Sequence, residues 1–596
     1  MRIADYIVKR LSDEGVQHIF AVSGRGALFL TDAVARNSEI EYVATHHEQA
    51  AGFAAVAYAQ YNSNLGACIV STGCASTNAI TAVLSAWQDG IPTIFISGQN
   101  TLRETTNFTK LAIRTYGQQE ADIIKMVKSI TKYSTMVTDP NSIRLIMDRA
   151  IHEATTGRKG PVWIDVPLDI QSKQIEPNLL EGISIEPKEL ESPALELEVN
   201  LMIDALRNAM RPVILVGSGV HSSGSGEVFT ELIEKNPIPV VFSGSATDTY
   251  GTQNKWSIGS VGMMGCSRAG NFAIQNADLI IVLGNRLSTM TTGTDFSTFA
   301  REAKIMVIDI DPIEHSKDSI KIQDMINADL KELLPLLLEH DIPETDDAWL
   351  EKCLHWKDLF SSVEPNFLNA NEVDLYELAA GFSEALPDNA TIVCDSGLIE
   401  LILPTNIKFG RGIRCVHPVS QGAMGYAVPA AVGVQLASRQ PVVVVVGDGS
   451  IMMNLQELQT ISHLGLPIKI FVVNNNAYAI IRKRQNELFR GRTVGTDKTN
   501  GLSCPSFLDT ARAFGFSYVQ INESVRLKEQ LEAVLEIVGP VLCEVKGDPN
   551  QDYIQTSHLQ NSKKRFIRRP LEDQHPFLDR NLLKTEMVIK MIGEDD

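Results

Sequence analysis

Two polar clusters in the last third of the chain have residue types suited to holding a metal-bound diphosphate. In the first, the apolar run VVVVV leads directly into Gly447-Asp448-Gly449-Ser450. Glycines allow tight backbone geometry, so exposed N–H groups can approach a phosphate closely. Asp448 supplies a hard oxygen ligand of the kind suited to Mg²⁺ that bridges a diphosphate.

The second cluster, Asn474-Asn475-Asn476, follows the next apolar run, IKIFVV. A strand–helix–strand unit returns this cluster to the same sheet edge as the GDG turn, because the carboxyl ends of parallel strands meet there. An Asp, an amide oxygen and a backbone carbonyl could then hold three positions of an octahedral Mg²⁺.

Two further residues stand at the starts of helices rich in small residues. Glu48 opens the helical run EQAAGFAAVAYAQ, and Met424 lies in Gly422-Ala423-Met424-Gly425 ahead of YAVPAAVGVQLA. A Glu at such a position usually serves as a cap or faces the helix dipole, and a Met there usually packs in the core. The residues alone leave these structural roles open.

GDG with Asn475 placed 27 residues after Asp448 resembles the signature of the thiamine diphosphate enzymes. The resemblance implies Mg²⁺ held by Asp448, the Asn475 side chain and the Ala477 carbonyl. It also implies backbone contacts from Gly449 and Ser450 to the diphosphate.

The run HEQAAGFAA resembles the segment that carries this superfamily's catalytic glutamate, which would be Glu48 facing N1′ of the aminopyrimidine. That carboxylic acid shares a proton with N1′ and promotes the 4′-imino tautomer, which generates the carbanion nucleophile. By the same resemblance, the Gly422 carbonyl accepts a hydrogen bond from the 4′-amino group, and Met424 holds the cofactor bent.

Over nearly the whole chain, the sequence resembles most closely the catalytic subunits of acetolactate synthases, as in GQQEADIIKMVKSITKYS and GPVWIDVPLDIQ. These enzymes decarboxylate a 2-oxoacid, usually pyruvate, and join the two-carbon unit to an acceptor carbonyl. The resemblance implies a homodimer or homotetramer, in which Glu48 and Asp448 meet across a subunit interface.

Departures from that group concern the expected acceptor pocket. Leu168 replaces the usual Lys, and Arg484 stands where a Trp is usual, beside Arg482. Guanidinium groups favour an acceptor with phosphate or many hydroxyls, and the alternative is that these arginines are surface residues of a solvated helix turn. The family's pocket Gln is retained as Gln119, and the turn Ser23-Gly24-Arg25-Gly26 adds a cation near the mouth.

These substitutions resemble acetolactate-synthase-like proteins associated with surface-polysaccharide sugars, some of which add two carbons to a nucleotide-linked keto-sugar. A thiamine diphosphate carboligase with such an acceptor is therefore the leading hypothesis. A plain acetolactate synthase and a simple 2-oxoacid decarboxylase are the alternatives. The decarboxylases usually carry paired histidines, which NFTKLAIRTYGQQE lacks. A non-catalytic protein on the same fold is a third alternative, which the retained Glu48 and Asp448 argue against.

The elements that position these residues predict an α/β fold. Short apolar strands alternate with helices, as in GACIVSTGCASTNAITAVLSAW, which indicates parallel sheets buried on both faces. By resemblance, three Rossmann-like parallel-sheet domains are expected. The boundaries we predict are a pyrimidine-binding domain at 1–172, a linker at 173–195, a central domain at 196–340, a linker at 341–365, a diphosphate-binding domain at 366–550 and a tail at 551–596.

The central domain has a weak dinucleotide signal in its Gly-rich turn, VILVGSGVHSSGSG. In acetolactate synthases this domain binds FAD that does no redox work, and in relatives it binds ADP or nothing. GNRLS retains Arg286, but Ser288 and Thr289 replace the usual acidic pair. Bound FAD and a purely structural domain both remain open, as does the role of the tail's basic run KKRFIRR.

Composition excludes several classes. A formal charge of −19 argues against a nucleic-acid binder, which needs a basic face. No run approaches 18 apolar residues, so we expect no membrane span, and the start MRIADYIVKRLSDEG does not read as a signal peptide. The eight cysteines include no CxxC pair, which favours a reduced, cytoplasmic compartment.

Overall fold

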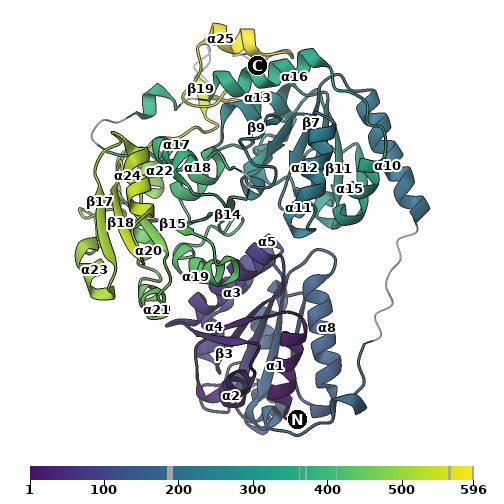
Figure 1. The fold of residues 1–596 in the computed structure, drawn as a ribbon, viewed down its shortest axis with the longest axis vertical. Helices are drawn as coiled ribbons and strands as arrows, with labels where there is room; N and C mark the ends of the chain where they lie inside the picture. The colour runs from purple at the N-terminus through teal and green to yellow at the C-terminus, as the bar shows by residue number, and fades with distance from the viewer. Residues whose placement is uncertain (184–191, 362, 369–371, 411, 561–565, 594–596) are drawn as a thin grey trace.

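Three six-stranded parallel sheets, each covered by helices, make up most of the computed structural model (Figure 1). The structure describes residues 1–183, 192–361, 363–368, 372–410, 412–560 and 566–593. The predicted α/β class with three parallel-sheet units is confirmed. The strands form because their apolar residues are buried on both faces, as in Val442–Gly447, whose five valines are all buried.

The first sheet has the strand order β2-β1-β3-β4-β6-β5. Its strands are β1 (His18–Ala21), β2 (Glu41–Ala44), β3 (Gly66–Val70), β4 (Thr93–Gln99), β5 (Tyr133–Met136) and β6 (Pro161–Pro167). Its helices include α1 (Ile3–Asp13), α2 (Leu28–Arg36), α3 (Glu48–Asn62), α4 (Cys74–Asn78), α5 (Ile80–Asp89), α7 (Ile123–Val127) and α8 (Ile143–Thr155).

The central sheet has the order β12-β11-β10-β7-β8-β9. Its strands are β7 (Pro212–Val216), β8 (Val240–Phe242), β9 (Ser257–Ser260), β10 (Leu279–Leu283), β11 (Lys304–Asp309) and β12 (Asp324–Asn327). Its helices include α10 (Ser192–Arg207), α11 (Gly219–Ser222), α12 (Gly226–Lys235), α13 (Arg268–Asn276), α14 (Thr289–Thr292) and α15 (Leu330–Glu339).

The third sheet has the order β14-β13-β15-β16-β18-β17. Its strands are β13 (Thr391–Cys394), β14 (Arg414–Val416), β15 (Val442–Gly447), β16 (Lys469–Asn474), β17 (Ser517–Ile521) and β18 (Val541–Lys546). Its helices include α17 (Leu375–Ala385), α18 (Leu398–Asn406), α19 (Ala427–Ser438), α20 (Asp448–Ile451), α21 (Glu457–Leu464), α22 (Ala479–Phe489), α23 (Phe507–Phe514) and α24 (Leu527–Leu535).

Helices α3 and α19 pack directly on each other and join the first sheet's layer to the third's, as Figure 1 shows. Their contact is close because Gly433 has no side chain. A Cβ built on Gly433 would lie 2.1 Å from the Ala54 carbonyl oxygen. Buried residues of both helices belong to one continuous apolar core, so the start of α3 is held against the third domain.

The chain after β18 returns to the central sheet. It forms the hairpin β19 (His558–Gln560) and β20 (Phe566–Arg568), and then α25 (Arg580–Glu586), which lies beside α16 (Asp347–Leu359) at the top of Figure 1. The Glu586 carboxylate accepts hydrogen bonds from Lys352 Nζ at 2.7 Å and Trp356 Nε1 at 3.0 Å. The tail is therefore part of the central domain's packing.

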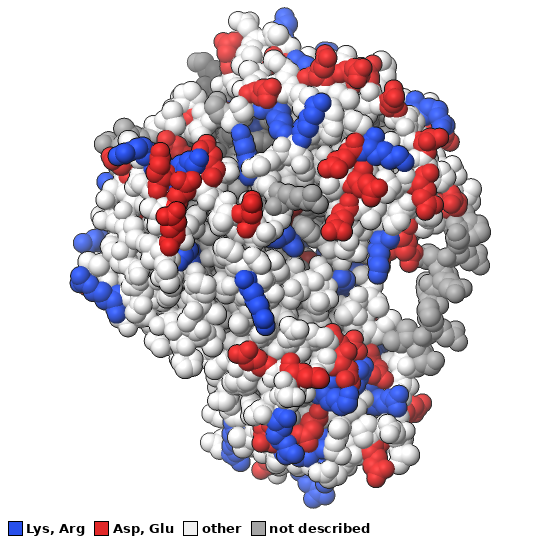
Figure 2. Space-filling model, in the orientation of Figure 1, with Lys and Arg blue, Asp and Glu red and all other residues white. Residues whose placement is uncertain are grey.

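Acidic and basic side chains are interspersed over the face drawn in Figure 2. In the part of the chain that the structure describes, no helix has both the length and the apolar composition needed to cross a bilayer.

Candidate active site at two strand ends

Asp448 lies where β15 passes into α20, and it is 3% exposed. Its Oδ1 accepts a hydrogen bond from the Gly449 N–H at 2.7 Å. Its Oδ2 is buried without a hydrogen-bond partner among the described residues. A carboxylate oxygen rarely remains unpaired in a protein interior, because its desolvation is then uncompensated.

The asparagine loop lies beside this carboxylate because β15 and β16 are neighbouring parallel strands, with Gly447 opposite Val473. Burial raises the pKa of Asp448 to about 6, and nearby backbone N–H groups, including those of Asn475 and Ala477, pull it back down. Asn475 Oδ1 accepts the Ala477 N–H at 3.0 Å, which closes the loop. The structure thus brings Asp448, Asn475 and Ala477 together.

This arrangement fits a hard cation. The unpaired Asp448 oxygen supplies a ligand, and Asn475 and Ala477 carry the amide and carbonyl oxygens that Mg²⁺ accepts. Among residues whose placement is described, no group of three His, Cys, Asp or Glu side chains could hold a metal. A cation here would therefore depend on one carboxylate with neutral oxygens and a ligand's own phosphates.

The GDG turn has no room for a larger residue. A Cβ on Gly449 would lie 1.9 Å from Cε1 of Tyr478, the residue that precedes α22. Ser450 is buried in the first turn of α20, and its hydroxyl bonds the Asp395 carboxylate. The backbone N–H groups at this end of α20 thus lie in a closely packed turn.

Asp395, at the end of β13, pins the loop that carries Gly422 and Met424. Its carboxylate accepts the N–H groups of Gly425 at 3.1 Å and Ala427 at 2.8 Å, where α19 begins. Gly422 and Gly425 both have positive φ, +59° and +79°, a conformation that favours glycine. Our sequence reasoning missed Asp395, although its place after the strand TIVC gave a signal.

Glu48 is the first residue of α3 and is half-buried. Its Oε2 accepts a hydrogen bond from Asn78 Nδ2 at 2.9 Å. Within the described part of the chain, no hydrogen bond or ion pair joins Glu48 to Asp448 or to its loop. A single chain therefore leaves these two predicted groups without direct contact.

Gly24, Arg25 and Gln119 come together at the edge of the first sheet. Arg25 Nη1 donates to Gln118 Oε1 at 3.2 Å. Gln119 has φ +62°, and its carbonyl oxygen lies 1.7 Å from where a Cβ on Gly73 would be, just before α4. Asn78, which donates to Glu48, is the last residue of α4. Gly24, Arg25 and Gln119 therefore lie at the same edge of the first sheet as Glu48.

Arg482 and Arg484 lie on α22 and face the segment that leaves β18. Arg482 binds the Pro549 carbonyl and, at 3.3 Å, Asn550 Oδ1. Arg484 donates to Glu487 at 3.1 Å and to Gln555 at 3.2 Å, and its side chain is 44% exposed. Both arginines are therefore hydrogen-bonded to the segment that follows β18, and the Arg484 side chain remains partly accessible to solvent.

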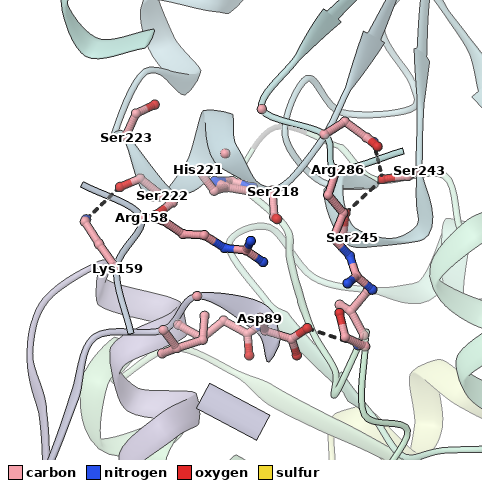
Figure 3. A pocket seen from close by; sticks show the side chains of 18 of the residues that line it. Asp89, Arg158, Lys159, Ser218, His221, Ser222, Ser223, Ser243, Ser245 and Arg286 are labelled. Carbon is pink, nitrogen blue, oxygen red and sulfur yellow. Dashed lines mark hydrogen bonds between the residues drawn. The ribbon is translucent and has the colours of Figure 1, made fainter. Parts of the chain in front are cut away.

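A cavity of about 1360 Å³ lies where all three domains meet (Figure 3). Its central-domain lining includes Arg286 and several serines that follow the strands. The first domain contributes Asp89, Arg158 and Lys159. Arg158 pairs with Asp311 at 3.1 Å and Glu314 at 2.7 Å.

Glu400 and His417 line the part of the cavity nearest the Gly422 loop. Glu400 Oε2 lies 3.3 Å from where a Cβ on Gly422 would be. Hydrogen bonding and the Glu400 charge raise the pKa of His417 to about 9, although burial alone would lower it. His417 Nδ1 lies 3.9 Å from Glu400 Oε1, which places this His–Glu pair beside the Gly422 loop.

The sequence matches three models of one family. These are the N-terminal TPP binding domain of thiamine pyrophosphate enzymes at residues 1–126, the central domain at 199–337 and the C-terminal TPP binding domain at 395–545. The N-terminal match contains Glu48, and the C-terminal match contains Asp448.

Similar curated proteins align with about nine-tenths of this chain. The acetolactate synthase large subunit of Parasynechococcus marenigrum (strain WH8102) is 31% identical over 90% of this chain and 86% of its own. The isozyme 2 large subunit of Escherichia coli (strain K12) is 30% identical over 92% and 96%. The probable large subunit of Methanocaldococcus jannaschii is 31% identical over 92% of each. The chain therefore belongs to the thiamine pyrophosphate enzymes and is a carboligase of the acetolactate synthase type.

Proposed function

We propose that the protein uses thiamine diphosphate and Mg²⁺ to decarboxylate a 2-oxoacid, pyruvate, and transfers the two-carbon unit to a carbonyl acceptor. The observation that carries this proposal is the buried, unpaired Oδ2 of Asp448, beside Asn475 and Ala477. These three residues would hold Mg²⁺, and Gly449 and Ser450 would bind the diphosphate through their backbone.

The bound cofactor would supply the nucleophilic carbon that adds to the donor's carbonyl. Glu48 would hold the proton at N1′ of the aminopyrimidine, the Gly422 carbonyl would accept from the 4′-amino group, and Met424 would support the ring. On the resemblance to the acetolactate synthase catalytic subunits, we propose a dimer in which Glu48 serves the cofactor bound by a second copy.

For the acceptor we propose a larger and more polar carbonyl compound than pyruvate, a nucleotide-linked keto-sugar. Three features support this choice. Leu168 removes a pocket cation, Arg25 adds one near Gln119, and Arg484 retains exposed guanidinium surface that could bind phosphate or hydroxyls. Arg482 is more fully engaged by Pro549 and Asn550, so it contributes less to this argument.

The second candidate is acetolactate synthesis from two molecules of pyruvate. It is favoured by the names of the relatives, which are acetolactate synthase subunits at about 30% identity over nine-tenths of the chain. A simple decarboxylase is the weakest alternative, because residues 107–120 contain no histidine for its acid–base step.

Turnover of pyruvate by the purified protein with thiamine diphosphate and Mg²⁺ distinguishes these functions. CO₂ and acetolactate are measured together, with and without a panel of nucleotide keto-sugars. We expect slow CO₂ release that accelerates when the right sugar is present. Acetolactate formed from pyruvate alone at ordinary enzymatic rates would replace the sugar proposal with the plain synthase.

The central cavity is the site where we propose a dinucleotide, FAD, with ADP as the smaller alternative. A volume of about 1360 Å³ exceeds the usual size of a small-ligand pocket, and Arg286 with Ser218 and Ser243 gives donors for phosphate. Flavin released by acid from protein purified without added FAD tests this. Its absence, together with no thermal shift on adding FAD or ADP, would favour a purely structural domain.

A further inference from the structure

The residues on both sides of Glu48 are held by the segment that follows the Asp448 turn. The His46 backbone N–H donates to both Glu457 carboxylate oxygens, at 3.1 and 3.3 Å. Gln49 Oε1 accepts a hydrogen bond from Asn454 Nδ2 at 3.0 Å. Glu457 begins α21, and Asn454 lies in the connection between α20 and α21. The third domain thus forms hydrogen bonds to the start of α3 at two points, His46 and Gln49.

Glu457 is a fully buried carboxylate, with 0% exposure. Thr460 Oγ1 donates to it at 2.6 Å, and Gln456 Nε2 lies at 3.5 Å. Among the described residues, no Lys or Arg forms an ion pair with it. Burying a carboxylate costs free energy unless donors compensate, and among the described residues the His46 N–H is its one donor from outside its own segment. The His46 contact therefore offsets part of the cost of burying the Glu457 carboxyl group.

Asn454 extends the connection to the loop that carries Met424. The same Nδ2 group that donates to Gln49 also donates to the Gly425 carbonyl at 2.8 Å. This loop is tightly packed, because a Cβ on Gly425 would lie 2.5 Å from Met453 Cβ. One amide therefore joins the Glu48 turn to the Met424 loop of the same chain.

We propose that Glu457 and Asn454 are positioning residues, which fix the turn at the start of α3 so that the Glu48 carboxylate points at its cofactor. Neither residue needs to touch the reacting atoms. The inference rests on the proposed function, in which Glu48 serves the cofactor bound by a second copy. In that dimer, each connection joins the Glu48 of one site to the Met424 loop of the other, so the two sites are mechanically linked.

The test compares Glu457→Met, which keeps the volume but removes both acceptors, with Glu457→Gln, which keeps one. In protein without cofactor, hydrogen exchange of the His46 amide should become at least tenfold faster in Glu457→Met. With cofactor, kcat and the rate of deuterium exchange at the cofactor's C2 should fall at least tenfold. KM for pyruvate and cofactor retention should stay within threefold, and Glu457→Gln should restore most of each loss.

Glu572→Met is the control at a distant buried carboxylate, because Glu572 lies in the tail, where it accepts from Gln275 at 2.7 Å and pairs with Arg301 at 2.9 Å. It should lower stability without changing His46 exchange. If Glu457→Met does not fold, Asn454→Ser, which lacks the amide that donates to Gln49, is tested through kcat and C2 exchange, both of which should fall. Unchanged His46 exchange, or faster exchange with normal kcat and C2 exchange, would overturn the proposal. Normal turnover in Glu48→Gln would instead overturn the proposed function. The His46 exchange result does not depend on turnover, so it would still show whether Glu457 holds this turn.

Discussion

Replacing Gly433 with Ala tests the contact between α3 and α19. The new Cβ would lie 2.1 Å from the Ala54 carbonyl oxygen and 2.9 Å from its carbon. Both belong to the backbone of α3, which no rotamer change can move aside. Since non-bonded carbon contacts are favourable only from about 3.5 Å outward, the two helices must separate by roughly 1 Å.

The size of the effect follows from two opposing terms. Overpacking a well-packed core costs about 1–3 kcal/mol, and a rigid backbone contact belongs at the upper end. Alanine is preferred to glycine inside a helix by about 1 kcal/mol, which offsets part of this cost. We therefore expect a net loss of about 2 kcal/mol, or roughly 4–8 °C in Tm for a domain of this size.

Thermal unfolding of Gly433→Ala beside Gly226→Ala measures the effect. Gly226 begins α12, and a Cβ on it would have the Thr249 carbonyl oxygen as its nearest neighbour, 4.0 Å away. That control should keep or slightly raise Tm. Because α3 carries Glu48, turnover in Gly433→Ala should also fall, by about 100-fold for a displacement near 1 Å. Equal Tm values for both variants and wild type would refute the close-packing argument.

Four other predictions concern single side chains. Asp448→Ala should abolish Mg²⁺-dependent retention of thiamine diphosphate in equilibrium dialysis, and unchanged affinity would refute its role as a ligand. Glu48→Gln should retain the cofactor but lose turnover by orders of magnitude, as steady-state kinetics would reveal. Arg484→Trp should shift product formation toward pyruvate self-condensation, and an unchanged acceptor preference would put Arg484 outside the pocket. Burial raises the pKa of Asp165 to about 7, so the folded state favours its protonated form. Stability should therefore fall as pH rises from about 4 to 7. Asp165→Asn should flatten this slope when Tm is measured against pH.

The sequence predicts well where the strands end, because a strand end is determined by residues that are neighbours in the chain. A short run of β-branched valines before GDGS favours a buried strand, and the following helix returns the asparagines to the same edge. The closeness of Asp448 to the asparagine loop is therefore predictable from the sequence, whereas the choice of Asn475 and Ala477 within that loop needs the family resemblance. The roles of Glu48 and Met424 need the family resemblance, because a Glu or Met at a helix start has ordinary structural uses.

Features that depend on how domains pack are not predictable in this way. The cavity draws Arg158 from one domain, Arg286 from another and Glu400 from a third, and no periodicity relates them. For the tail's basic run, the sequence alone does not decide between a solvated surface and an anion contact. Residues 563–565 lie outside the described part of the chain, but Arg569 is 3% exposed and pairs with Asp573 at 2.7 Å.

The return of the tail to the central domain affects the order in which the molecule can be completed during synthesis. Asn271 on α13 donates to the Gln574 side chain, which lies 303 residues later in the chain. At about 5–20 residues per second, a ribosome needs roughly 15–60 seconds to cover that distance. The last strand of the central sheet, β12, is completed early in this interval, but the surface that later receives the tail stays uncovered until the tail is made. This surface of α13 is therefore accessible to chaperones that bind nascent chains for most of that time.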